Sequence, residues 1–174
     1  MNAAWQARRA GKGASRASPE PRRRDSVEAL FQLKARPEGQ GSLLLGAEWS
    51  RVEPYVDTGL LSAERYAEMR ASWPGPFTWV APRSARTPPW LVGEHRGVAV
   101  RVTAHAPAAA LCRAAGTALV STSANPHGMP AATTTQQVLG YFGAALAGVL
   151  DAPGGTLEGP TPIRDAITGQ YLRS

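Results

Sequence analysis

Cysteine is nearly absent from this chain: Cys112 is the only one among 174 residues. An intrachain disulfide is therefore excluded, and no cysteine-based metal site can form within one chain. This shortage fits a reducing, cytoplasmic setting, and we expect Cys112 to be an inert thiol on the apolar face of a helix. No stretch approaches the roughly 18 consecutive apolar residues of a spanning helix, so membrane insertion is not expected.

Several common catalytic motifs are also lacking. The sequence contains no P-loop, no G-x-G-x-x-G, no H-E-x-x-H and no G-x-S-x-G. The enzyme classes that these motifs define are therefore not supported. The three histidines, His95, His105 and His127, have no partners at the spacing of a metal site or a catalytic triad.

Acidic residues are fewer than basic ones, and the imbalance is local. The net charge is +6, and residues 1–24 account for all of it with seven basic residues and one acidic residue. The remaining residues, 25–174, are neutral and predict a single domain. We expect residues 1–24 to form a basic, unpacked tail, because they combine charge with Gly and Pro and have few apolar anchors. Their abrupt change of composition also fits an altered start site, a frameshift or a truncation of the gene.

Helical and strand patterns alternate along the rest of the chain, which predicts an α/β fold with a mixed sheet flanked by helices. Asp25 and Glu28 have the spacing of a capping box, Ser62 is a candidate N-cap, and Gly116 is a natural residue to follow a helix. The expected helices are 26–35, 49–56, 62–73, 107–115 and 135–146. The expected strands are 42–46, 77–81, 97–103, 118–121 and 148–151, with a closing hairpin of 163–168 and 171–173.

Polar residues follow one apolar strand directly, in the segment Leu119-Val-Ser-Thr-Ser-Ala-Asn-Pro-His-Gly128. In an open α/β sheet, ligands bind at the carboxyl ends of strands, where small hydroxyls and backbone amides can approach a phosphate. A nucleotide or other anion site around Ser121, Ser123 and Asn125 is one interpretation. A strand followed by a polar turn with no ligand is the other.

Three basic residues stand at positions that need an explanation. Arg101 lies inside an apolar strand, where a guanidinium must either pair with a carboxylate or await an anionic ligand. Lys34 and Arg36 follow an expected helix, where cations are favoured by the negative end of the helix dipole. The sequence pattern leaves these alternatives open.

Five ordered motifs together resemble the YrdC/TsaC family, the threonylcarbamoyl-AMP synthases. They are Leu33-Lys-Ala-Arg-Pro37, Trp73-Pro-Gly-Pro-Phe-Thr78, Ala99-Val-Arg-Val102, Leu119-Val-Ser-Thr-Ser-Ala-Asn125 and Thr161-Pro-Ile-Arg-Asp165. The resemblance implies a YrdC-like domain and a nucleotidyltransferase that makes L-threonylcarbamoyl-adenylate and pyrophosphate from L-threonine, bicarbonate and ATP, with Mg²⁺ bridging the phosphates. Partner transferase proteins would then modify adenosine 37 of tRNAs that read ANN codons.

The resemblance also implies roles for particular residues. Lys34 and Arg36 would contact the ATP phosphates. Thr78 and Arg101 would line the same cavity, and Thr161 would close over it. Ser121, Ser123 and Asn125 would hold the nucleotide and the threonine end of the intermediate.

One family feature does not occur in this sequence: a strand ending in Pro-Thr-Glu, followed by a Gly-rich segment with Gly-Cys-Asp-Pro. The resemblance therefore predicts a sheet that is incomplete at the N-terminus and a synthase whose threonine pocket is impaired. The alternatives are a tRNA- or dsRNA-binding module of the same fold without catalysis and, less favoured, a carbamoyl-transfer module.

Overall fold

Strands from distant parts of the chain form one mixed sheet of six strands in the described residues, in the order β4-β1-β3-β2-β5-β6. The computed structural model describes residues 21, 23–37, 39–146, 148–150 and 159–174. The strands are β1 (Leu43–Gly46), β2 (Thr78–Pro82), β3 (Gly97–Val102), β4 (Leu119–Ser121), β5 (Ile163–Asp165) and β6 (Tyr171–Arg173). The parallel pairs are β1 with β3 and β2 with β5, and the other pairs are antiparallel. The predicted α/β class is confirmed.

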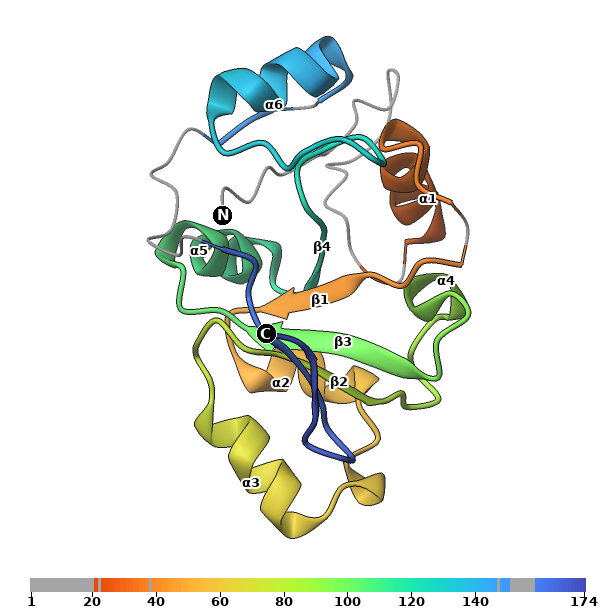
Figure 1. Cartoon of the computed structure of the whole chain (residues 1–174), viewed down its shortest axis with the longest axis vertical. Coiled ribbons are helices and arrows are strands. Elements are labelled where there is room, and N and C mark those ends of the chain that lie inside the picture. The colour runs from red at the N-terminus through yellow and green to blue at the C-terminus, as the bar shows by residue number, and fades with distance from the viewer. Residues whose placement is uncertain (1–20, 22, 38, 147, 151–158) are drawn as a thin grey trace.

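Helices cover the two faces of this sheet unequally (Figure 1). Four helices contribute side chains to the main core on one face: α1 (Arg24–Leu33), α2 (Trp49–Val52), α3 (Ala63–Ala71) and α4 (Pro89–Val92). The helix α5 (Ala106–Ala115) packs on the opposite face against β1 and β4. The helix α6 (Thr135–Phe142) lies at one end of the molecule. Three short 3-10 helices complete the described elements, at Glu53–Tyr55, Thr58–Leu60 and Gly143–Ala145.

Alternation along β3 explains how the sheet separates its two faces. Val98, Val100 and Val102 are buried in the main core, together with Trp79 of the neighbouring strand. Full burial of one such side chain contributes about 1.5 to 3 kcal/mol. Because successive residues of a strand point to opposite faces, Arg101 is on the other face, the one that α5 partly covers. We call this the α5 face.

Two predicted helix ends are confirmed and one is wrong. The hydroxyl of Ser62 accepts from the Arg65 amide at 3.2 Å, and Gly116 has a positive φ of 69° after α5. Asp25, however, is not an N-cap, because α1 begins at Arg24 and Arg23 occupies the cap position. The carboxylate of Asp25 instead accepts from Arg23 at 3.0 Å, within the first turn of the helix, where a negative charge is favoured.

The predicted strand at 148–151 is also wrong for its described part, because residues 148–150 form no strand. Leu150 is 49% exposed, and Val149 packs against the apolar cluster that includes Val138 and Phe142 without pairing with a strand. Residue 151 lies outside the described residues. The helix predicted for 135–146 ends earlier, at Phe142, with Gly143 at a positive φ of 47°.

Two residues of the expected tail, Pro21 and Arg24, contact Trp90 of α4. Pro21 is fully buried, and its carbonyl accepts from Nε1 of Trp90 at 3.1 Å. The guanidinium of Arg24 lies 5.9 Å from the centre of the Trp90 ring. The rest of the expected tail, residues 1–20 and 22, lies outside the described residues. None of the described helices has the length and apolar character needed to span a membrane.

Candidate functional site

Polar side chains from several strands share the α5 face. Strand register places Ser121 beside Leu43, and Leu43 beside Ala99. Thr78 lies on the same face, because Trp79 next to it points into the main core. Neighbouring strands are about 4.8 Å apart, so the face from β4 to β2 spans roughly 14 Å. The predicted residues of two motifs are thus brought onto one surface.

Arg101 lies at the centre of the first group of polar side chains. Its Nε donates to the hydroxyl of Thr78 at 2.9 Å, and its Nη2 donates to the hydroxyls of both Thr78 and Thr161. Each threonine is only 2% exposed. The backbone carbonyl of Thr161 also accepts from Arg173, at 2.8 Å from Nη2. Two guanidinium groups therefore converge on one threonine.

This convergence carries an electrostatic cost. Burial, with a smaller contribution from the nearby charge of Arg173, lowers the pKa of Arg101 to about 10. Arg101 is still a cation at neutral pH. Its hydrogen-bond partners in the described structure are neutral hydroxyls, which satisfy its donors without compensating its charge. An anion placed on this face would supply that compensation.

Lys34 and Arg36 form the second group, next to the loop that follows β4. The Lys34 ammonium donates to the backbone carbonyls of Ser123 and Asn125 and lies 3.4 Å from Oδ1 of Asn125. Arg36 donates to the hydroxyl of Thr122 at 3.0 Å and to the Gly41 carbonyl at 2.5 Å. These contacts place both cations against the segment predicted to bind nucleotide.

Burial changes the acid–base properties of this second group. Burial, together with repulsion from Arg36, lowers the pKa of Lys34 to about 8. Burial also lowers the pKa of Arg36. The Nε of Arg36 is buried and has no hydrogen-bond partner among the described residues. A buried donor of this kind costs free energy unless a ligand or water satisfies it.

Carboxylates do not neutralise these cations within the described part of the chain. The salt bridges found there are Arg23–Asp25, Arg24–Glu28, Arg65–Glu68 and Arg164–Glu68. None of them includes Lys34, Arg36 or Arg101. For Arg101, the described residues thus provide hydroxyl partners and no carboxylate partner.

All eight predicted site residues fall within these two groups or on the strand between them. Arg101, Thr78 and Thr161 form the first group, and Lys34 and Arg36 contact the loop of the second. Ser123 and Asn125 contribute backbone carbonyls to Lys34, so their contact with this residue does not use their side-chain hydroxyl or amide nitrogen. Ser121 is half-buried on the α5 face.

Sequence reasoning missed two members of these groups. Arg173 ends β6, and only the hairpin fold brings it to Thr161. Thr122 accepts from Arg36, although the sequence analysis singled out its neighbours on either side. Alternation of strand residues offered a weak signal for Arg173, and the run of hydroxyls after β4 offered one for Thr122.

Metal ligands do not gather in the described residues, which contain no group of three His, Cys, Asp or Glu side chains placed to hold an ion. Cys112 is buried, and burial raises the pKa of its thiol to about 11. The residue is thus an inert part of the core in the described structure, as predicted. The chemistry available on the α5 face is anion binding by cations, hydroxyls and backbone groups.

The fold and the two groups define an α/β domain with buried or half-buried cations that have no carboxylate partners among the described residues. A family model described as Sua5_yciO_yrdC, telomere recombination, matches residues 19–174. This chain belongs to the Sua5/YciO/YrdC family.

Individual relatives agree with this assignment. A threonylcarbamoyl-AMP synthase of Xylella fastidiosa (strain M23) is 46% identical over 154 residues, which are 88% of this chain and 82% of that protein. One from Halorhodospira halophila is 49% identical over 154 residues, with 88% and 80% covered. The structure of P. abyssi Sua5 complexed with L-threonine matches with a TM-score of 0.77 at 25% identity, over 84% of this chain. This chain spans 42% of that larger protein. The names support a transferase role.

Proposed function

We propose that this protein synthesises L-threonylcarbamoyl-adenylate from L-threonine, bicarbonate and ATP. The observation that carries the proposal is the set of buried or half-buried cations on and beside the α5 face, Lys34, Arg36 and Arg101, which lack carboxylate partners among the described residues. A substrate with several negative charges would compensate them. The relatives named threonylcarbamoyl-AMP synthase and the threonine complex of Sua5 support the choice of substrates.

In this proposal the second group binds the phosphates of ATP. Arg36 has a planar guanidinium with an unpartnered Nε, which suits a fork of hydrogen bonds to phosphate oxygens. Lys34 is a point charge whose present partners are two carbonyls, and it exchanges one of them for a phosphate oxygen when ATP binds. The hydroxyls of Ser121 and Ser123 and the amide of Asn125 complete the contacts to the nucleotide and the intermediate.

In this proposal the first group, around Arg101, binds the substrates at the reacting end, where the carbamate meets the α-phosphate. Arg101, with Arg173 beside it, compensates a carboxylate or the developing charge at the α-phosphate. Thr78 and Thr161 fix the plane of the Arg101 guanidinium through their hydroxyls. A positioned charge of this kind stabilises a transition state without reorganising during the reaction.

The reaction depends mainly on how the protein positions its substrates. The threonine amine attacks the carbon of bicarbonate and a water molecule leaves, which gives a carbamate. A carbamate oxygen then attacks the α-phosphorus of ATP, and the bond to the β-phosphate oxygen breaks to release pyrophosphate. Both steps gain from holding the reactants together and from neutralising phosphate charge, and neither needs a protein nucleophile.

Mg²⁺ would enter as part of the nucleotide substrate. The described residues provide no cluster of carboxylates for it, which fits an ion held by phosphate oxygens and water. The product would be a mixed anhydride, which partner transferase proteins would use to modify adenosine 37 of tRNAs that read ANN codons.

Calorimetry with ATP and Mg²⁺ tests the binding half of the proposal. Arg36→Met should weaken ATP binding by roughly ten- to a hundredfold, because a hydrogen bond to a charged group is worth about 1.5 to 3 kcal/mol. The matched control is Arg113→Met, which changes an exposed arginine on α5. Equal ATP affinity in wild type and Arg36→Met would refute the assignment of the phosphate site.

A further inference from the structure

The hairpin of β5 and β6 carries two of the groups that meet at Arg101. Thr161 lies two residues before β5, and Arg173 ends β6. The position of the hairpin relative to β2 and β3 therefore sets the geometry of the Arg101 group. Any residue that fixes the hairpin acts on this group from a distance.

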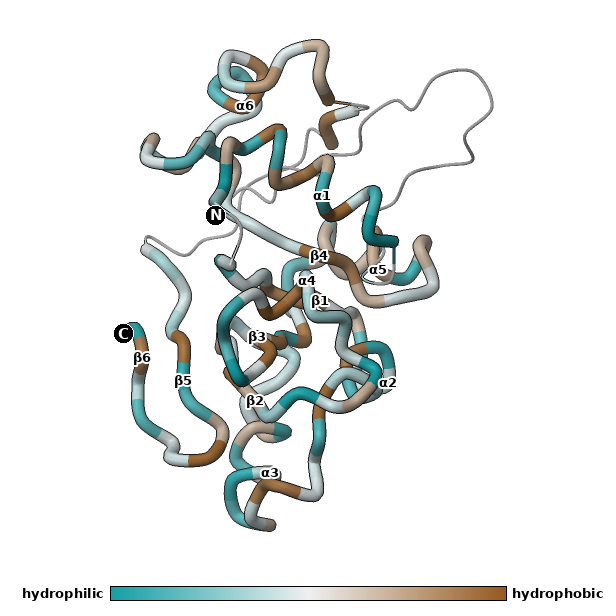
Figure 2. The backbone as a smooth tube through the Cα atoms, turned by 90° about the vertical axis from the view of Figure 1, so that its right-hand side faces the viewer, coloured by the Kyte–Doolittle hydropathy of each residue, from teal (hydrophilic) through white to brown (hydrophobic). Residues whose placement is uncertain are grey.

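Apolar contacts alone give the hairpin little anchorage. It joins the sheet through three residue pairs between β2 and β5. Three of its large apolar side chains, Ile167, Tyr171 and Leu172, are 60%, 56% and 58% exposed. Figure 2 shows the two strands running along one side of the domain. Because so little of the hairpin's apolar surface is buried, polar contacts must hold much of the hairpin in place.

Arg164 supplies those contacts. Its Nε and Nη2 donate to the carbonyl of Gly169 in the hairpin turn, at 3.1 and 2.9 Å. Its Nη1 donates to the carboxylate of Glu68 on α3. The guanidinium also lies 4.6 Å from the centre of the Trp79 ring and 5.0 Å from that of Tyr171. One side chain thus joins the hairpin turn, β6, the core strand β2 and a helix.

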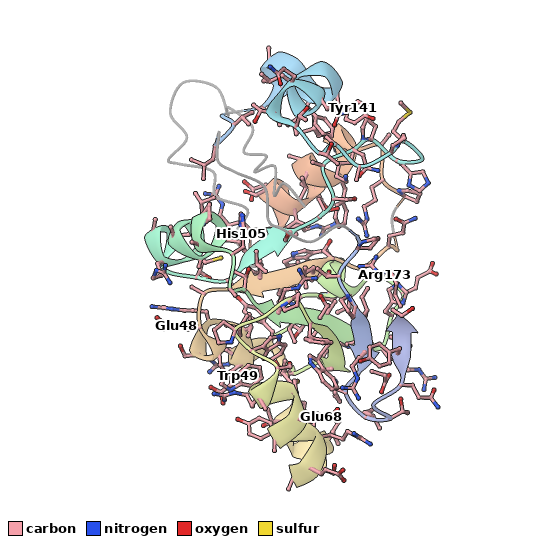
Figure 3. The ribbon with its side chains drawn as sticks, turned by 60° about the vertical axis from the view of Figure 1, so that its left-hand side comes forward. Glu48, Trp49, Glu68, His105, Tyr141 and Arg173 are labelled. Atoms are coloured by element: carbon pink, nitrogen blue, oxygen red, sulfur yellow. The ribbon has the colours of Figure 1, made fainter. Side chains whose placement is uncertain are left out.

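Glu68 connects this arrangement to a second cation. Its carboxylate also accepts from Arg65, and the pair of arginines holds the pKa of Glu68 below its usual value, mainly through the bond from Arg164. The Arg65 guanidinium packs against Gly169, where an added Cβ would lie 2.7 Å from Cζ. Figure 3 shows Glu68 on α3 and Arg173 at the end of the hairpin.

We propose that Arg164, held by Glu68, is a positioning residue that places Thr161 and Arg173 against Arg101. Arg164 points into the main core side of the sheet, opposite the α5 face, so it does not touch the substrates and acts through the hairpin. The inference deepens the proposed synthase function and rests on it for its kinetic consequence. Its structural consequence, a change in the surroundings of the Arg101 guanidinium, can be measured without activity.

The test uses Arg164→Met in the full chain, with Arg70→Met as the matched control. Arg70 lies on α3 and also stacks on two rings, Trp49 and Tyr66, but it makes no hydrogen bond, ion pair or ring contact with the described residues of the hairpin. The first readout is the NMR signal of the Arg101 Nε–H, assigned by its loss in Arg101→Lys. We expect that signal to shift in Arg164→Met and to stay in place in Arg70→Met.

The second readout is amide hydrogen exchange, which should accelerate at least roughly tenfold for β5 and β6 in Arg164→Met. The third is pyrophosphate release, in which KM for L-threonine or ATP should rise about ten- to a hundredfold, as expected for a site displaced by about 1 Å. Arg164→Lys keeps a positive charge beside Glu68 but loses the paired hydrogen bonds to the Gly169 carbonyl. Its KM should therefore lie between those of wild type and Arg164→Met.

Particular results would overturn the inference. An unchanged Arg101 signal together with faster exchange of the hairpin would show that Arg164 holds the hairpin without affecting the site. If Arg164→Met does not fold, the same readouts on Arg164→Lys and Glu68→Gln decide, and wild-type values in both would refute the role. An inactive wild-type chain would count against the proposed synthase, while the NMR and exchange results would still decide the positioning role.

Discussion

Arg101 and Thr161, sixty residues apart in sequence, meet through a hydrogen bond from Nη2 of the arginine to the hydroxyl of the threonine. The arginine comes from a central strand and the threonine from the approach to the C-terminal hairpin. Both are held on the α5 face, where Thr78 accepts from the same guanidinium. This bond closes the site with a segment from the far end of the chain.

Replacing Arg101 by Met should abolish tight ligand binding while keeping the fold. Methionine fills a similar volume and removes a charge that no described carboxylate compensates, so the free energy of unfolding should stay the same or rise. Binding of ATP or L-threonine should weaken by at least about tenfold, the loss expected for one charged hydrogen bond. Calorimetry and denaturant unfolding of the same variant provide the two measurements.

A mutant that is unfolded at room temperature would identify Arg101 as a structural residue and contradict this expectation. Arg113→Met is the control, because that arginine is exposed on α5. It should match wild type in both measurements.

Thr161→Val should affect stability as well as binding. The variant removes the hydroxyl that accepts from Arg101 but keeps the shape of the side chain, so Nη2 of Arg101 keeps only Thr78 as a partner, at a cost of about 1 to 3 kcal/mol. Thr161→Ser keeps the hydroxyl and should recover most of that loss. Chemical denaturation measures both, and equal stability of the valine and serine variants would show that the hydrogen bond contributes nothing.

The sequence predicted most of the elements because their local signals agree with the tertiary structure. Alternation in β3, the cap at Ser62 and the C-terminal glycine of α5 each require only a few neighbouring residues. The capping box at Asp25 failed because Arg23 and Arg24 extend the helix by pairing with its own acidic residues. The strand at 148–151 failed in its described part because alternation alone does not provide a partner.

ATP affinity should fall as the pH rises above about 8, because burial lowers the pKa of Lys34 to about 8. A phosphate binds the ammonium form, so the contribution of Lys34 is complete below this pKa and is lost above it. Calorimetry between pH 6.5 and 9.5 should show the decline in wild type. Lys34→Arg remains charged throughout the range and should show no decline from this group.

The free energy of unfolding should rise with pH, whereas the ATP affinity falls. The folded pKa of Lys34 lies below that of an unfolded lysine, about 10.4, so the unfolded chain binds the proton more tightly between these values. The free energy of unfolding contributed by this group should therefore rise from about pH 8 to about pH 10. A rise of equal size in Lys34→Met would assign the effect to other groups.

The candidate site shows where sequence reasoning stops. Motif resemblance indicated which residues belong together, yet composition and spacing left Arg101 undecided between a carboxylate partner and a ligand. The structure surrounds its guanidinium with threonine hydroxyls and places no described carboxylate in a salt bridge with it. The position of Arg173 in the site could not be predicted from the sequence, because its contact with Thr161 depends on the hairpin register and not on any local pattern.

Cys112 should resist thiol reagents in the folded protein. Its side chain is 1% exposed, Sγ lies 3.4 Å from the Leu45 carbonyl, and burial raises its pKa to about 11. At pH 8 the thiolate fraction is then on the order of a hundredfold below that of a free cysteine. A disulfide reagent should label one thiol per chain only after denaturant is added. Rapid, complete labelling of the native protein would contradict the buried position.

Pyrophosphate release from ATP tests the central claim most directly. The full chain is incubated with ATP, Mg²⁺, L-threonine and bicarbonate, and parallel reactions omit one substrate at a time. The account predicts release of pyrophosphate with formation of threonylcarbamoyl-AMP only when all three substrates are present, and a loss of at least about tenfold in Arg36→Met and Arg101→Met but not in Arg113→Met. Absence of release from the wild-type chain, or release that does not depend on L-threonine, would contradict it. Salt-sensitive RNA binding by such an inactive chain would instead favour the non-catalytic RNA-binding module.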